Sequence, residues 1–182
     1  MHLPPFTPEG LLPAGDFPLT LRELRDSFLV TGSRAGSASW DATWRARLVD
    51  NLSELADQLW QVGIGDIFID GSFAEQKDHP NDIDGYFECD LMYLATGKLE
   101  ADLNRIDRYH CWTWDPMRRR LDTSSGKSQL PMWHAYRVEL YPHCSAILSG
   151  IRDQWGNNQP FPSAFRLARY SFVRKGIVKL IR

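Results

Sequence analysis

The chain has 182 residues and a mass of 20.9 kDa, which fits a single domain, and 43% of its residues are hydrophobic, enough for a core of ordinary size. A net charge of -2 and a pI of about 6.2 exclude the global basic field of a dedicated nucleic-acid-binding protein. No apolar run reaches the length of a membrane span, and the proline-rich first twenty residues lack the pattern of a secretory signal. We therefore expect no membrane partner and a cytoplasmic location.

The cysteines agree with that location. Cys89, Cys111 and Cys144 are odd in number and widely spaced, and no CxxC pair occurs, which predicts free thiols in a reducing compartment. Two of them follow histidines directly, at 110 and 143, but adjacent residues on a strand point to opposite faces and do not have the spacing of zinc ligands.

The N-terminal third predicts an extended arm followed by helices. Residues 1–19 are proline-rich and are expected to run along the body of the protein. Thr20 and Glu23 have the spacing of a capping box, which predicts a helix as far as Val30, and the small polar residues 31–39 predict a loop. The longest helix is expected from Trp40 to Val62, where apolar residues recur at steps of three and four: Trp44, Leu48, Leu52, Leu55, Leu59 and Val62.

Two strands are expected next, with a polar turn between them. Gly63 ends the long helix, and residues 66–70 form a short apolar strand. After the turn at 75–81, residues 83–94 are expected to form a second strand. Gly85 in this strand suggests a bulge or the close approach of another backbone.

The C-terminal half continues to alternate between helices and strands. The expected elements are a helix at 98–109, a short strand at 110–114, an exposed loop at 116–131, a strand at 134–141, a helix at 161–172 and a terminal strand at 176–181. Arg137, Glu139 and Tyr141 share one face of the fourth of these elements, because strand side chains alternate. Together these elements predict an α/β (α+β) fold, with a small mixed sheet flanked by helices in one domain of residues 1–182.

The residues with the most chemical content lie between 66 and 90. Asp82 and Asp84 are two positions apart, so a strand would point both carboxylates to one face while Ile83 points to the core. Two neighbouring carboxylates repel unless a cation lies between them, and oxygen ligands of this kind suit magnesium bound together with phosphates. Gly71 and Ser72 end the preceding strand and offer backbone N–H groups and a hydroxyl to such phosphates.

This arrangement of Gly71, Ser72, Asp82 and Asp84 resembles the signature of nucleotidyltransferases of the DNA polymerase β superfamily, and most closely its minimal, stand-alone bacterial and archaeal members. The motif proper covers residues 66–90. The proline-rich start followed by LRELRDSF and the closing RKGIVKLI resemble a small uncharacterised group of that superfamily, which extends the likeness to most of the chain. The resemblance implies the nucleotidyltransferase fold, with Mg²⁺ or Mn²⁺ as cofactor and a nucleoside triphosphate, ATP foremost, as substrate.

The resemblance also assigns roles to individual residues. Asp82, Asp84 and a third acid on a later strand, here Glu139, would be the catalytic residues and metal ligands, although the family more often has aspartate at the third position. Gly71, Ser72 and Lys77 would bind the nucleotide. The arginine that often follows Gly-Ser in the family is absent, since Phe73 stands there, and Lys77 is also compatible with a solvated turn.

The resemblance implies the transfer of a nucleoside monophosphate, AMP foremost, from a nucleoside triphosphate to a hydroxyl on a protein or RNA acceptor. It also implies a place in a toxin–antitoxin or defence system that includes a partner protein encoded nearby. No DNA partner is expected. Arg118, Arg119 and Arg120 are candidates for contact with the acceptor or are simply part of a solvated loop. Two alternatives stay open: an inactive nucleotide-binding or protein-interaction module of the same fold, and a metal-dependent phosphoesterase.

Two further motifs are set aside. GSRAG at 32–36 resembles the Gly-Ser turn, but no apolar strand precedes it, and SGKS at 125–128 lacks the first glycine and the preceding strand of a P-loop.

Overall fold

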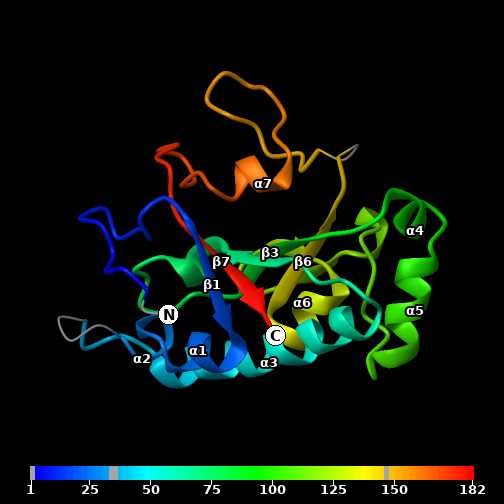
Figure 1. Cartoon of the computed structure of the whole chain (residues 1–182), viewed down its shortest axis with the longest axis horizontal. Helices are drawn as coiled ribbons and strands as arrows, with labels where there is room; N and C mark the ends of the chain where they lie inside the picture. Colours follow the sequence, from blue (N-terminus) through cyan, green and yellow to red (C-terminus); the bar gives the residue numbers. More distant parts are fainter. Residues whose placement is uncertain (1–2, 33–36, 146–147) are drawn as a thin grey trace.

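The computed structural model describes residues 3–32, 37–145 and 148–182. The protein is 35% helical and 22% strand, with a five-stranded mixed sheet flanked by helices, which confirms the predicted fold class. The strands of this sheet are β1 (Asp16–Thr20), β2 (Ile67–Asp70), β3 (Ile83–Glu88), β6 (Val138–His143) and β7 (Ile177–Ile181). Their order is β1-β7-β2-β3-β6 (Figure 1); β2 runs antiparallel to both β3 and β7, while β1 is parallel to β7 and β3 is parallel to β6.

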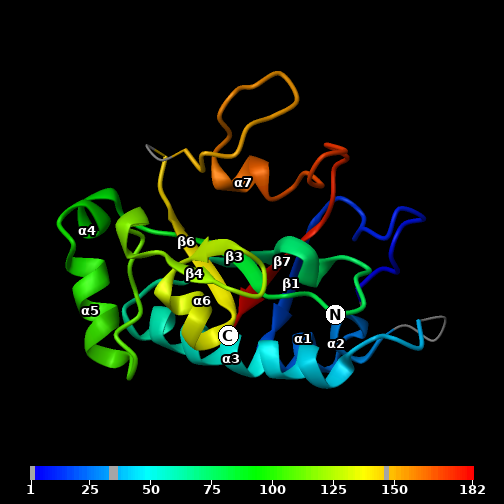
Figure 2. The ribbon, with the colours of Figure 1, turned by 180° about the vertical axis from the view of Figure 1, so that it is seen from behind.

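The helices lie mainly on one face of the sheet. They are α1 (Leu21–Asp26), α2 (Phe28–Thr31), α3 (Ala42–Gln61), α4 (Leu91–Ala95), α5 (Lys98–Ile106), α6 (Pro131–Tyr136) and α7 (Phe161–Ala164), with two 3₁₀ turns, η1 (Gly71–Ala74) and η2 (Pro116–Arg118). Figures 1 and 2 show α1, α2, α3 and α6 below the sheet, α4 and α5 at one end, and α7 with its flanking loops above the opposite face. None of the described helices is long and apolar enough to cross a bilayer.

The alternation of β3 separates the two faces. Ile83 and Phe87 belong to the main core between the sheet and the helices, whereas Tyr86 belongs to a smaller cluster with Phe161 and Phe165 beneath α7. Asp84 lies on the same face as Tyr86, because the two are two positions apart in a regular strand. The acidic residues of β3 therefore point toward the α7 side and away from the main core.

The longest helix agrees with its sequence pattern. α3 begins after Asp41, whose carboxylate accepts the backbone N–H of Trp44 at 2.9 Å, and its buried apolar face includes Leu48, Leu52, Leu55 and Leu59. Two polar side chains of α3 are also buried, Gln58 and the completely buried Arg45. A cation in the core requires partners, and these lie in the functional site.

The N-terminal prediction is partly wrong. The capping box of Thr20 and Glu23 is present, but Ser27 adopts an extended conformation and divides the expected helix into α1 and α2. Residues 16–20, expected in the arm, form β1 and pair with β7. β1 is an edge strand, where a proline is tolerated because one row of backbone groups needs no partner. Positions 33–36 of the expected loop, which include most of GSRAG, lie outside the described residues.

The second predicted strand is too long. β3 ends at Glu88, and Asp90 caps α4 by accepting the backbone N–H of Tyr93 at 2.8 Å. The close backbone approach at Gly85 is confirmed, because a Cβ there would lie 2.4 Å from the carbonyl oxygen of Phe68. Gly85 pairs in register with both neighbouring strands, so β3 has no bulge at this position.

The expected strand at 110–114 does not form, because side chains take the backbone donors that a neighbouring strand would use. The N–H of Cys111 donates to the carboxylate of Asp107, and that of Trp112 donates to the side chain of Asn104, both at 2.9 Å. All three cysteines are free thiols, as predicted.

Three later predictions also need correction. The expected loop at 116–131 contains η2 and a hairpin of β4 (Arg120–Asp122) and β5 (Lys127–Gln129). The strand expected from 134 is preceded by α6, and Arg137 adopts a left-handed conformation between the two, with φ of 56°. The helix expected at 161–172 is only the single turn of α7. The terminal strand is confirmed as β7.

Candidate functional site

Acidic residues meet where β2, β3 and β6 run side by side. Asp70 at the end of β2 is the register partner of Asp84, and Asp84 is in turn the register partner of Glu139 on β6. Register partners on adjacent strands present their side chains to the same face. Asp82 lies one residue before β3, so the structure brings the three predicted acids together and adds Asp70 as a fourth.

The Gly-Ser turn lies directly against these acids. Gly71 has φ of 71°, and a Cβ at this position would lie 2.5 Å from Oδ2 of Asp84, so only glycine fits both the backbone conformation and the space. Ser72 follows in η1, and its hydroxyl has no hydrogen-bond partner among the described residues. The turn therefore offers a free hydroxyl next to buried carboxylates.

Arg45 of α3 holds this turn from below. Its guanidinium donates to the carbonyl oxygens of Leu29 and Phe73 at 2.6 and 2.8 Å, and to those of Glu75 and Lys77 at 3.2 and 2.6 Å. Burial lowers the pKa of Arg45 to about 10, which still leaves it charged at neutral pH. The backbone of 73–77 is thus fixed by one buried cation.

Asp70 and Lys175 form a buried ion pair beside the turn. Nζ of Lys175 lies 3.1 Å from Oδ1 of Asp70 and also pairs with Glu75. Oδ1 of Asp70 has no hydrogen bond of good geometry within the described structure. Burial raises the pKa of Asp70 to about 7, although the charge of Lys175 acts in the opposite direction.

Asp84 lies among the other acids of the cluster, and both burial and like charge act on its carboxyl. Part of its surface remains exposed, yet the protein that surrounds its carboxyl raises its pKa well above the ordinary 3.8, chiefly through desolvation. The negative charges of Asp82, Glu139 and Asp70 act in the same direction, and only Lys175 opposes them. The cluster holds more negative charge than its neighbours compensate.

Asp82 and Glu139 are oriented by donors. The indole N–H of Trp133 donates to Oδ2 of Asp82 at 2.7 Å, which leaves Oδ1 free of described partners. Both oxygens of Glu139 are engaged, Oε1 by the backbone N–H of Leu130 at 2.7 Å and Oε2 by the hydroxyl of Tyr141. Arg119 lies 3.7 Å from Oε1 of Glu139.

These observations decide how well the residues fit a divalent cation. No three His, Cys, Asp or Glu side chains in the described ranges are already arranged to hold a metal ion. The donor chemistry nevertheless fits a hard cation at Asp82 and Asp84, because all the candidate ligands are carboxylate oxygens. One oxygen of Asp82 is free, and Asp84 is surrounded by the negative charges of the other acids. Glu139 lies beside this pair, but it must release its present donors before it can join the ligand set.

The structure places the remaining predicted residues around this site. Lys77 is exposed in the turn, and its side chain makes no hydrogen bond or ion pair within the described part of the chain. Phe73 is buried, with its ring 5.1 Å from the guanidinium of Arg45. Sequence reasoning missed Asp70, Lys175 and Arg45, although the last lies three and seven positions before core leucines, a position that normally holds an apolar residue.

A cavity of about 580 Å³ lies near β6, and none of the four acids of the cluster lines it. Its lining includes His110, Arg118, Arg119, Arg120 and His134. Arg119 connects the two places, because it reaches both Glu139 and, at 3.1 Å, the hydroxyl of Tyr141. The arginines singled out in the sequence therefore line a pocket that Arg119 links to Glu139.

Comparison with known proteins places the chain in a family. No curated protein and no solved structure matches it. A family model matches residues 4–181, which is nearly the whole chain. The protein belongs to DUF6932, a family of unknown function.

Proposed function

We propose that the protein is a metal-dependent nucleotidyltransferase that moves AMP from ATP to a hydroxyl on a macromolecular acceptor. One observation carries this proposal: Asp84 and Glu139 are register partners on β3 and β6, with Asp82 beside them and the Gly71 turn against Asp84. Clustered carboxylates beneath a small-residue turn are what the binding of a metal–triphosphate complex requires.

The protein's own residues would bind and orient the reactants. Ser72 and the backbone N–H groups after Gly71 would bind the terminal phosphates of ATP, in a turn that Arg45 keeps rigid. Trp133 would hold Asp82 in place through its indole N–H. Positioning of this kind contributes much of the rate in phosphoryl transfer, because the reaction needs little covalent participation by the protein.

In the reaction, the acceptor oxygen forms a bond to the α-phosphorus of ATP while the bond from that phosphorus to the bridging oxygen breaks. Pyrophosphate leaves, and the proton of the hydroxyl passes to the carboxylate cluster. Asp82 and Asp84 would hold the divalent cation, Mg²⁺ or Mn²⁺, with Glu139 as the third ligand once its donors have turned away. When bound, such a cation neutralises charge on the phosphates and lowers the pKa of the attacking hydroxyl.

The cellular setting is part of the proposal. The three free thiols suit a reducing compartment, so we place the activity in the cytoplasm. We place the acceptor and a partner protein encoded nearby in a toxin–antitoxin or defence system.

One observation favours a second candidate, an inactive nucleotide-binding module. Both oxygens of Glu139 are engaged by donors, and the buried ring of Phe73 occupies the position at which the resembling family often has a phosphate-binding arginine. If these features reflect lost catalysis, the protein would bind ATP and a partner without transfer.

Transfer assays separate these candidates. The full chain is incubated with nucleoside triphosphates labelled at the α-phosphate, Mg²⁺ or Mn²⁺ and a cell lysate. Wild type and Asp57→Asn, an exposed site on the outer face of α3, should label an acceptor, and the double variant Asp82→Asn/Asp84→Asn should not. Release of products without labelling would indicate a phosphoesterase, and saturable ATP binding with neither reaction would support the module.

A further inference from the structure

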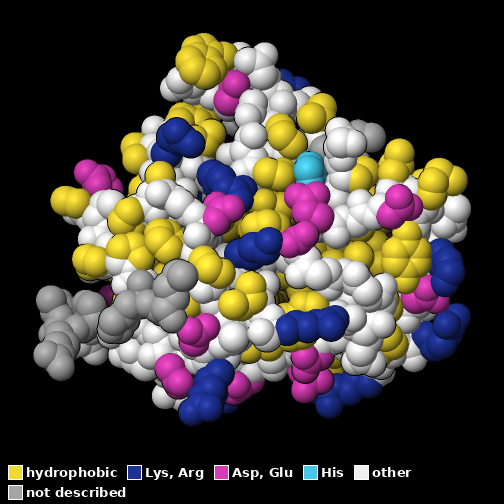
Figure 3. Space-filling view, in the orientation of Figure 1, with side chains coloured by type: hydrophobic (Ala, Val, Ile, Leu, Met, Phe, Trp, Pro, Cys, Tyr) yellow, Lys and Arg dark blue, Asp and Glu magenta, His cyan; other side chains and the backbone are white. Residues whose placement is uncertain are grey.

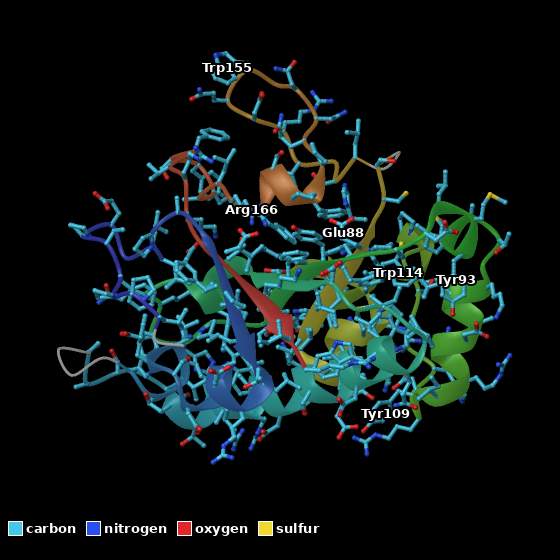
Figure 4. The ribbon with its side chains drawn as sticks, viewed as in Figure 1. Glu88, Tyr93, Tyr109, Trp114, Trp155 and Arg166 are labelled. Atoms are coloured by element: carbon cyan, nitrogen blue, oxygen red, sulfur yellow. The ribbon has the colours of Figure 1, made fainter. Side chains whose placement is uncertain are left out.

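The segment between β6 and β7 forms two hairpin-like loops above the sheet. In the first, residues around Arg152 and Asn158 pair across a turn, and Trp155 lies at the tip. In the second, Leu167 pairs with Arg174 around a tip that contains Tyr170. Figure 4 shows Trp155 at the outer end of the first loop, pointing away from the body of the protein.

The charge of this segment differs from that of the rest of the chain. Residues 148–175 contain five basic side chains and one acidic one, a net charge of +4, whereas the whole chain carries -2. Two of the basic residues face inward, since Arg166 pairs with Asp16 and Lys175 is buried.

The other three basic residues face solvent. Arg152, Arg169 and Arg174 are exposed and form no ion pair with any residue that the structure describes. The one acidic residue, Asp153, is occupied by the backbone N–H groups of Trp155 and Asn157. The loops therefore present a positive surface that nothing in the described chain neutralises.

Exposed aromatic rings accompany this charge. Trp155 is 78% exposed and Tyr170 is 82% exposed. Tyr170 and Phe172 both have left-handed backbone conformations, with φ of 73° and 56°, which is costly for aromatic residues and keeps the tip tightly turned. The guanidinium of Arg169 lies 5.3 Å from the centre of the Tyr170 ring. Figure 3 shows hydrophobic and basic side chains interspersed along this upper part of the molecule.

We propose that residues 148–175 form a binding surface for single-stranded nucleic acid. Flat exposed rings stack on unpaired bases, and unpaired arginines contact the phosphates between them. A duplex keeps its bases stacked on one another and offers nothing to Trp155 and Tyr170. An acidic peptide would satisfy the arginines but would leave both rings in water. The combination of rings and guanidinium groups therefore favours a single strand.

The surface is connected to the carboxylate cluster from its inner side. Phe161 of α7 stacks on Tyr141 with ring centres 5.2 Å apart, and Tyr141 donates to Glu139. Lys175, the last residue of the segment, pairs with Asp70. Figure 4 shows Arg166 and Glu88 between α7 and the sheet, where the two regions meet. The binding of a single strand does not depend on the proposed function. The further step, in which the bound strand supplies the acceptor hydroxyl, rests on that function.

Fluorescence anisotropy with the full chain tests the binding in the absence of nucleotide and divalent cation. The probes are short labelled oligo(U) and oligo(dT), which separate RNA from DNA as the source of the strand, and a duplex of the same length. Wild type should bind at least one single-stranded probe more tightly than the duplex. Three arginine contacts predict a slope of about -2 in a plot of log affinity against log salt concentration. Undetectable binding at low salt, or equal binding of duplex and single strand, would overturn the proposal.

Variants locate the surface. Trp155→Ala and Tyr170→Ala should each weaken binding at least about fivefold, and Arg169→Ala and Arg174→Ala should reduce the salt slope. Tyr109→Ala, an exposed ring near α5, is the matched control and should bind as wild type does. If only Arg118→Ala or Arg120→Ala abolishes binding, the nucleic-acid strand lies in the cavity near β6, which contradicts the proposal. If polyglutamate at equal charge displaces the oligonucleotide, the partner of this surface is an acidic protein, which also contradicts it.

Folding and catalysis are controlled separately. All variants lie at exposed positions, so their circular dichroism and Tm should match wild type. A variant at a ring position that fails this check is replaced by Trp155→Gln or Tyr170→Gln. Asp84→Asn should bind the oligonucleotide with unchanged affinity. Binding without any transfer would refute the proposed function alone, and transfer without binding at the loops would refute this proposal alone.

Discussion

The buried carboxyl of Asp70 should make the stability of the metal-free protein fall as the pH rises. Its pKa is raised from 3.8 to about 7, because desolvation disfavours the charged form more than Lys175 favours it. A group whose pKa is raised on folding stabilises the protein fully below its unfolded pKa, and that contribution is lost as the pH rises through the folded value. The window is therefore about pH 4 to pH 7. Lys175 keeps its charge throughout, since its pKa is itself raised.

The size of the effect follows from the difference between the two pKa values. At about 1.4 kcal/mol for each pKa unit, a rise from 3.8 to about 7 corresponds to ~4 kcal/mol. Asparagine resembles the protonated acid, so Asp70→Asn should equal wild type in stability near the lower end of the window and exceed it by up to ~4 kcal/mol at about pH 8. Asp84 adds a pH dependence of the same sign, because its pKa is also raised.

Urea denaturation at several pH values, in the presence of a chelator, measures this difference. Asp57→Asn on the exposed face of α3 is the matched control and should follow wild type at every pH. Added Mg²⁺ should reduce the loss of wild-type stability at high pH, since a bound cation compensates the carboxylates. Equal stabilities of Asp70→Asn and wild type across the whole range would refute the reasoning.

Three further substitutions test the architecture of the site. Gly71→Ala and Gly63→Ala both force alanine into a left-handed conformation, at a cost of about 1–2 kcal/mol. Only Gly71→Ala also places a Cβ against Asp84, so only this variant should weaken Mn²⁺ binding in a calorimetric titration. Arg45→Met removes a donor from four carbonyl oxygens, two of them in buried hydrogen bonds, and should lower the free energy of unfolding by about 3 kcal/mol or more. The exposed Arg47→Met should change it little, and equal effects would show that Arg45 is not the anchor of the turn. Tyr141→Phe removes a donor from Glu139, costs about 1 kcal/mol of stability and should strengthen Mn²⁺ binding by freeing one oxygen. Binding that is unchanged or weaker would mean that Glu139 is not a ligand.

The features that sequence predicts well are local. The helix of α3 follows from the three- and four-residue spacing of its leucines, and the capping box of Thr20 and Glu23 depends on residues three positions apart. The turn at Gly71 follows an apolar strand directly, so the strand, the turn and the acids of β3 are neighbours in sequence as well as in space. The position of Glu139 on a strand beside β3 is also confirmed, although this expectation rests on the family resemblance and not on a local pattern.

The features that sequence does not predict join distant positions. β1 pairs with β7 across most of the chain, and the proline in β1 argued against a strand until its place at the sheet edge was known. Lys175 finds Asp70 more than one hundred positions away, and neither residue has a local pattern that indicates its partner. Short elements fail for a related reason: the residues at 110–114 resemble a strand, but Asn104 and Asp107 take their backbone donors first.

The central claim is that Asp82 and Asp84 bind a divalent cation together with a nucleoside triphosphate beneath the Gly71 turn. Crystals grown with Mn²⁺ and a non-hydrolysable ATP analogue test it most directly, through the anomalous signal of manganese. The account predicts a peak in contact with both carboxylates and with the phosphates of the analogue. A nucleotide bound elsewhere, or manganese absent from these carboxylates while the analogue is ordered, would contradict it.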